Sequence, residues 1–117
     1  MEEINMHAFV RFANLYCILV AFGLLLVTAV AYSAPAFEPN TFYSYRTGDS
    51  ITRTTGLVNA SGATAKAGDN SYLVLIKNDL SEPMRNAVLR HENCHVQQLK
   101  EGRAPSEEEC ELRMWFP

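Results

Sequence analysis

The sequence predicts an α+β fold in which an N-terminal apolar helix precedes a small mixed domain. Three observations lead to this prediction: a long uncharged apolar run before residue 37, one well-defined strand at residues 71–79, and two helices after that strand. We expect three parts, namely a signal peptide or membrane anchor (1–36), a linker with a weak β-hairpin (37–70), and a core of strand and helices (71–117). The chain of 117 residues has room for one domain at most.

The apolar run is the first element. No charged residue occurs between Phe12 and Phe37, and its middle is close to the roughly 20 apolar residues that span a bilayer. Small residues at positions 31–36 suit cleavage before Ala34 or before Phe37, whereas the acidic N-terminal flank differs from the basic start of a secretory signal. A buried core helix would need more covering chain than remains. A cleaved signal and an uncleaved membrane anchor both stay open, and both predict a secreted, periplasmic or membrane-anchored protein.

The charge of the chain excludes one class of partner. The formal net charge is -3, and the ten Lys and Arg residues are scattered rather than clustered. Binding to the phosphate backbone requires a basic patch. We therefore expect no nucleic-acid partner.

Residues 38–70 are rich in Gly, Ser, Thr, Asn and Ala and show little periodicity. The stretch SITRT, residues 50–54, alternates as a strand does, and turn-like residues flank it. We expect a weak hairpin here, with partial order at best before about residue 50.

The second half of the chain predicts a strand and two helices. Residues 71–79 form a β-branched and aromatic run between turn residues. A helix over residues 82–101 follows, with Ser81 as N-cap and Gly102 just past its end. The pair Ser106 and Glu109 has the spacing of a capping box, which predicts a C-terminal helix that packs on the first.

The first of these helices carries an unusual polar group. At 100° per residue, His91 and His95 project from one side, and Glu92 falls within an apolar arc between Leu99 and Val96. A buried ionised carboxylate costs several kcal/mol without a partner, so this position calls for a cation or a hydrogen-bonded water. Five other polar residues fall on the opposite side of the helix: Asn86, Arg90, Asn93, Gln97 and Lys100.

A divalent metal ion would satisfy this arrangement. Imidazoles at i and i+4 can reach one ion at about 2.0–2.1 Å from each nitrogen. Glu92, beside the ligands His91 and His95, would then act as the general base that takes a proton from a water activated by zinc. The alternative is a helix on which the two histidines are simply hydrogen-bonded or exposed.

The sequence His91-Glu92-Asn93-Cys94-His95 resembles the HExxH signature of the zincin metallopeptidases. The resemblance implies a zincin-like core at residues 71–117, Zn²⁺ as cofactor, and a peptide or protein as substrate. In that family the strand before the motif helix forms the edge of the cleft, and residues 71–79 stand in the corresponding place.

The C-terminal helix is similar to the second conserved element of the gluzincin branch. The resemblance implies that Glu107 is the third metal ligand and that Glu111 is the hydrogen-bond partner of a ligating histidine. Three consecutive glutamates leave the register open, so Glu108 is an alternative ligand, and the spacing from His95 matches only very compact gluzincins. A solvated helix start is the simpler interpretation of these glutamates.

Two of the three cysteines form a candidate disulfide. Cys17 lies in the apolar run, which leaves Cys94 and Cys110, one on each helix. In an oxidising compartment such a pair predicts a bridge, and closing a loop of this length stabilises a fold by about 3 kcal/mol in the chain-entropy model. In the alternative, Cys94 or Cys110 is a thiolate ligand of a closed structural zinc site.

Three functions follow from these patterns. The first is a small exported or membrane-tethered zinc-dependent hydrolase, a metallopeptidase whose oxyanion stabiliser is one of Tyr43, Tyr45, Tyr72 and Arg113. The second is a non-catalytic envelope or membrane protein with a structural zinc site or a degenerate motif. The third is a single-pass interaction protein with the Gly-Ser-Thr segment as a spacer.

Overall fold

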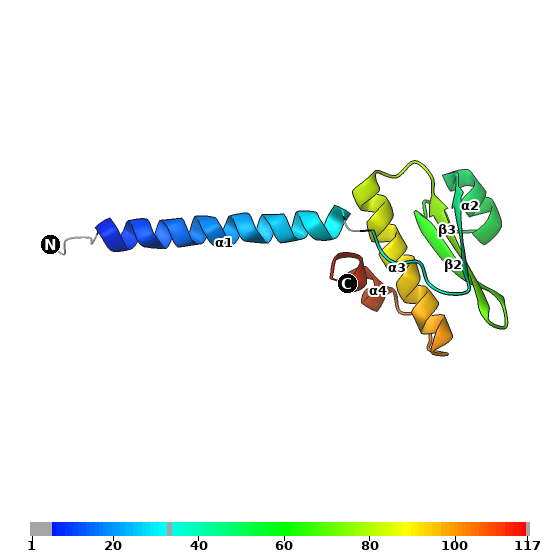
Figure 1. Cartoon of the computed structure of the whole chain (residues 1–117). Helices are drawn as coiled ribbons and strands as arrows, with labels where there is room; N and C mark the ends of the chain where they lie inside the picture. The colour runs from blue at the N-terminus through cyan, green and yellow to red at the C-terminus, as the bar shows by residue number, and fades with distance from the viewer. Residues whose placement is uncertain (1–5, 33, 117) are drawn as a thin grey trace. The chain divides into compact units, whose positions relative to one another are not determined.

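A computed structural model describes residues 6–32 and 34–116. The chain divides into two units, residues 1–30 and 31–117, and each is described by itself. The predicted α+β class is confirmed, with a three-stranded sheet and helices before and after it (Figure 1). The elements in chain order are α1 (Met6–Tyr32), β1 (Thr41–Arg46), α2 (Gly48–Thr55), β2 (Gly62–Gly68), β3 (Ser71–Lys77), α3 (Glu82–Lys100) and α4 (Glu107–Trp115).

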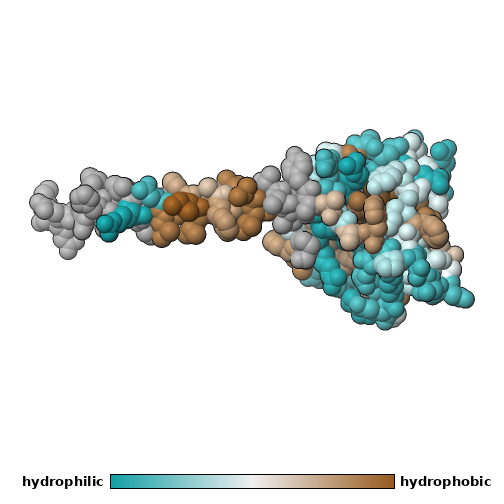
Figure 2. All heavy atoms as spheres, viewed as in Figure 1, coloured by the Kyte–Doolittle hydropathy of each residue, from teal (hydrophilic) through white to brown (hydrophobic). Residues whose placement is uncertain are grey.

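Helix α1 coincides with the apolar run. Leu15, Phe22 and Leu25 are more than half exposed. Figure 2 shows a brown, hydrophobic surface along part of this helix. Within residues 6–32 and 34–116, no helix has both the length and the apolar character needed to cross a bilayer. Ser33, which belongs to the predicted cleavage region, lies outside the described residues.

The sheet has the order β1-β3-β2, with β3 in the centre. Strands β2 and β3 form an antiparallel hairpin, whereas β1 pairs with β3 in parallel, with Thr41 opposite Tyr72. Parallel neighbours need a long crossover, and here α2 and β2 supply it. Strand β1 thus falls within residues 37–70, where the sequence suggested linker and a weak hairpin.

The hydrophobic core lies between the sheet and α3. Tyr72, Val74 and Ile76 alternate along one face of β3 and pack with Val88 and Val96 of α3. The predicted strand at residues 71–79 is therefore present as β3, two residues shorter at its end. The apolar face of β3 therefore determines which side of α3 packs against the sheet.

Helix α2 corrects the prediction for residues 50–54, which are helical rather than extended. The side chain of Thr47 accepts a hydrogen bond from the backbone N–H of Ser50, and Gly56, in the left-handed conformation, ends the helix. Only Ile51 is fully buried, and α2 contacts β2 and β3. These caps and one apolar anchor outweigh the strand preference of its β-branched residues.

Helix α3 begins and ends close to the predicted positions, and α4 begins at the predicted cap. Ser81 occupies the N-cap of α3 without a side-chain capping bond, and Gly102 follows the helix with a φ of 66°. The side chain of Ser106 accepts from the backbone N–H of Glu109, as the predicted capping box requires. The second predicted helix therefore exists as α4 and contacts α3.

The polar side of α3 is also covered, which the sequence did not predict. Asn86, Arg90 and Asn93 are at most 9% exposed. Arg90 donates from Nε to the carbonyl oxygen of Met114, and Asn93 accepts from the hydroxyl of Tyr43 at 2.6 Å. The segment after α1 and the end of α4 thus enclose a side that a helical wheel assigned to polar surroundings.

Candidate metal centre

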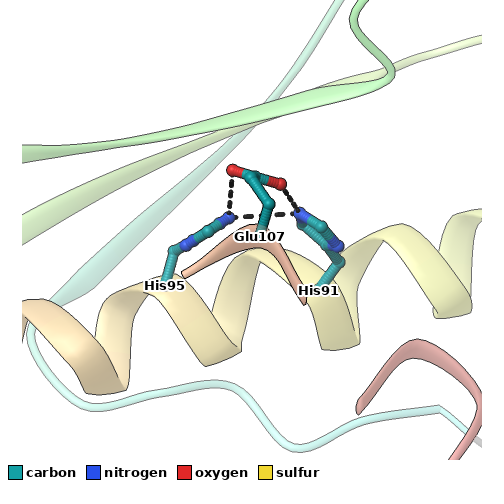
Figure 3. Close-up of side chains that lie close together, drawn as sticks. All are labelled: His91, His95 and Glu107. Carbon is teal, nitrogen blue, oxygen red and sulfur yellow. Dashed lines mark hydrogen bonds and ion pairs between the residues drawn. The ribbon is translucent and has the colours of Figure 1, made fainter. Parts of the chain in front are cut away.

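Three side chains converge where α3 and α4 meet. The Nε2 atoms of His91 and His95 lie 3.1 Å apart, one helical turn from each other. Glu107, at the first position of α4, places Oε2 3.0 Å from Nε2 of His91 and Oε1 2.9 Å from Nε2 of His95. Figure 3 shows the carboxylate lying above the two rings. Together these residues could hold a metal ion.

The donor atoms fit a common ion. Atoms bound to a tetrahedral Zn²⁺ at about 2.0–2.1 Å lie roughly 3.3 Å apart, so the three atoms would need to separate only slightly. The two imidazoles are largely buried, with side-chain exposures of 13% for His91 and 11% for His95, whereas that of Glu107 is 73%. Two ligands on the buried side and one reached from solvent leave a path for an ion to enter.

Glu92 is buried beside these donors, as the wheel predicted. It is 5% exposed, and one carboxylate oxygen accepts a hydrogen bond from the hydroxyl of Thr64 on β2 at 2.5 Å. Burial raises the pKa of this carboxyl, while the hydrogen bond from Thr64 and the two nearby histidines act in the opposite direction. The carboxylate therefore has a higher proton affinity than a solvated glutamate.

Gly62 allows β2 to approach Glu92. A Cβ at this position would lie 2.8 Å from Oε1 of Glu92 and 2.9 Å from Cγ1 of Val88. Both distances are shorter than van der Waals contact. The absence of a side chain at Gly62 is what allows Glu92 to lie against the sheet.

A pocket of about 540 Å³ opens over the site, and His91, Glu92, His95 and Glu107 all line it. The rest of its wall is uncharged: Thr55, Leu57, Ala60, Gly62, Ala63, Thr64, Ala65, Leu99 and Pro105. A molecule in this pocket would therefore meet the two imidazoles and both carboxylates at one place.

The predicted disulfide between Cys94 and Cys110 is present. It joins α3 to α4, and Sγ of Cys110 lies 3.5 Å from Nδ1 of His95. Because both sulfurs are in the bridge, neither is a thiolate available to a metal, which removes the closed His and Cys site from consideration. The bridge holds the helix that carries Glu107 against the helix that carries the histidines.

The other predicted acidic residues lie apart from the donor group. Glu108 is exposed and is not among the converging side chains. Glu111 is exposed at a neighbouring pocket that His91 also lines. Among the described residues it makes no hydrogen bond or ion pair with either histidine, and Nδ1 of His91 is buried there without a hydrogen-bond partner.

None of the four residues considered as oxyanion stabilisers lines the pocket over the donors, as far as residues 6–32 and 34–116 show. Tyr72 is in the core, and Tyr43 donates to Asn93. Tyr45 is exposed on β1, and Arg113 pairs with Glu109.

Two supporting residues were missed in the sequence. Thr64 lies on a strand too weak to be recognised, so its partnership with Glu92 had no local signal. Gln98 is fully buried and hydrogen-bonds to His95, and its place three residues after that histidine, one turn along the helix, was a usable signal.

Comparison of the chain with protein-family models, curated protein sequences and solved structures found no match.

Proposed function

We propose that this protein is an exported zinc-dependent hydrolase that cleaves peptide bonds. The observation that supports it most directly is the common pocket, which contains three potential metal ligands and a buried carboxylate that is not one of them. A purely structural site needs only the ligands. A second carboxylate in the same pocket, that of Glu92, accepts a hydrogen bond from Thr64 and has a use in proton transfer.

His91, His95 and Glu107 would hold the zinc ion. When bound, zinc supplies Lewis acidity, which polarises a carbonyl group and lowers the pKa of a water molecule. Glu92 would take the proton from the attacking water and deliver it to the leaving amine. Its raised pKa suits both steps, because the carboxylate binds the proton more readily than a solvated glutamate does.

The uncharged pocket wall and the disulfide support the remaining parts of the proposal. Leu57, Ala60, Ala63 and Ala65 offer small apolar surface, which suits an uncharged stretch of peptide rather than an anionic substrate. The bridge between Cys94 and Cys110 favours an oxidising compartment. The apolar residues of α1 favour delivery to such a compartment through the secretory route.

The test compares Glu92→Gln with Glu82→Gln, a control on the exposed first turn of the same helix. We expect both full-length variants to bind one equivalent of zinc. The Glu92 variant should lose hydrolysis of a quenched fluorescent peptide by about 100- to 10,000-fold, because the proton acceptor is gone. His91→Ala and His95→Ala should lose the zinc itself. Hydrolysis by Glu92→Gln within threefold of wild type would refute the proposal.

A second candidate is a non-catalytic protein with a structural metal site. It is favoured by the fact that both the donor group and the disulfide join α3 to α4, as a structural clamp would. In that case the wild-type chain binds zinc with no hydrolysis above that of the Glu92→Gln variant. Zinc content and peptide turnover measured on the same samples separate the two functions.

A further inference from the structure

The side chain of Gln98 is fully buried between the three candidate metal ligands and α4. Both the oxygen and the nitrogen of its amide have two hydrogen-bond partners. Its Oε1 accepts from the backbone N–H of Ser106 at 3.1 Å and lies 2.9 Å from Nδ1 of His95. Its Nε2 donates to the carbonyl oxygen of Ser106 at 3.2 Å and to Glu109 at 3.0 Å. One amide thus contacts a metal-ligand candidate and the start of the helix that bears another.

The orientation of this amide is fixed by its neighbours. The backbone N–H of Ser106 can only donate, so the atom facing it must be the oxygen. The carbonyl oxygen of Ser106 and the carboxylate of Glu109 accept, so the atom facing them must be the nitrogen. Because Oε1 only accepts, the proton between Gln98 and His95 must be on Nδ1 of His95.

This proton position determines what His95 presents to the donor group. A neutral imidazole has one N–H, so with Nδ1 protonated its Nε2 carries a free lone pair. That lone pair is directed to the place where Nε2 of His91 and Oε1 of Glu107 lie, at 3.1 and 2.9 Å. An unprotonated Nε2 of His95 and an ionised carboxylate oxygen of Glu107 are both acceptors, so they repel each other at 2.9 Å unless a proton or a metal cation lies between them.

We infer that Gln98 is a positioning residue for the metal site. It holds His95 in the Nδ1–H tautomer, so that Nε2 is ready to bind zinc. Through both backbone polar groups of Ser106, the N-cap residue, it also fixes the start of α4 and hence the neighbouring Glu107. This inference rests on the metal-binding part of the proposed function and does not depend on hydrolysis.

The test replaces Gln98 by methionine, which has a similar length but cannot form these hydrogen bonds. Gln97→Met is the matched control, because Gln97 donates to Glu38 on another side of α3. Zinc affinity is measured on the full chain by competition with a chelator, using Zn²⁺ alone. We expect Gln98→Met to weaken binding by about 10- to 100-fold and the control to change it by less than threefold.

The tautomer is measured separately on the metal-free chain by long-range ¹H–¹⁵N NMR, at a pH where the imidazole is neutral. Wild type and Gln97→Met should show the Nδ1–H form of His95, and Gln98→Met should lose this preference. Gln98→Glu retains an oxygen toward Nδ1 but cannot donate to Ser106, so it should keep the tautomer. This variant separates the effect on His95 from the effect on α4.

Two results would overturn the inference. One is an Nε2–H tautomer in the metal-free wild type, which needs no variant to fold. The other is a Gln98→Met chain that keeps both the Nδ1–H form and wild-type zinc affinity. If the wild-type chain binds zinc as expected but hydrolyses nothing, only the catalytic proposal is refuted. If the chain is active but His95 is in the Nε2–H tautomer, only the role of Gln98 is refuted.

Discussion

At the scale of single residues, the site depends on how closely β2 approaches α3. Glu92 is held by Thr64 on one side, and the missing side chain of Gly62 makes room for it on the other. Neither residue would bind a metal or move a proton. They matter because they place a carboxylate where it is both buried and hydrogen-bonded.

We expect Gly62→Ala to lower the free energy of unfolding by about 1–3 kcal/mol, because the new methyl group would overlap Glu92 and Val88. The stiff side chain of Val88 cannot easily move away. Gly68→Ala on the same strand is the control, since its methyl group would meet only the hydroxyl end of Ser71, which can rotate. Urea denaturation of the three proteins checks this. Equal stability of the two variants would contradict it.

The candidate metal ligands and the candidate base were easier to predict than the residues that support them. His91, Glu92 and His95 lie within one turn of helix, so their relation follows from helical geometry alone, and the structure brings Glu107 to them. Thr64 comes from a different element, and its partner could not be identified before the sheet was known. Gln98 lies on the same helix, but its second partner, Ser106, depends on how the two helices pack.

At the scale of elements, local signals decided what could be foreseen. The two ends of α3 follow from Ser81 and Gly102, and the start of α4 follows from the Ser106 cap, all of which act within one turn. Strand β1 had no such signal, because its partner β3 lies far along the chain. Helix α2 was mistaken for a strand because its Thr and Ile residues favour extended structure, while its caps lie outside the alternating stretch.

The first turn of α4 gives a pH dependence that can be measured. The hydrogen bond from Arg103, followed by that from Gln98, lowers the pKa of Glu109 from 4.5 to about 2. A depressed native pKa stabilises the fold above pH 4.5, and this contribution is lost as the pH falls toward 2. We therefore expect stability of the metal-free chain to decline between pH 4.5 and 2, and less steeply in Glu109→Gln.

The control for this experiment is Glu108→Gln, an exposed neighbour on the same helix. Its stability should decline with the wild-type slope over the same pH range, measured by urea denaturation at each pH. If Glu109→Gln and the wild type lose stability in parallel, the ion pair with Arg103 is not a source of the pH dependence.

At the scale of the whole molecule, the fold depends on few buried residues. The core between the sheet and α3 is small, so links that join its elements have a large effect on stability. The disulfide is one such link, and an ion held by His91, His95 and Glu107 would be a second. Both act on α4, which adds a single buried residue, Cys110, to the interior.

Removal of zinc should therefore lower the melting temperature. At free zinc about 100 times the dissociation constant, binding adds about 2.7 kcal/mol, which corresponds to a shift of roughly 10–20 °C in a domain of this size. Calorimetry of the full chain with and without a chelator checks this, with Mg²⁺ and the His91→Ala variant as controls. A wild-type melting temperature that does not respond to zinc would contradict the proposed site.

The positions of the three candidate metal ligands along the chain also bear on the order of folding. His91 is four residues from His95 and sixteen from Glu107, whereas the parallel pairing brings Thr41 to Tyr72. Short loops close at lower entropic cost and sooner than long ones. We therefore expect the two helices that bear His91, His95 and Glu107 to come together before β1, which carries none of these residues, pairs with β3.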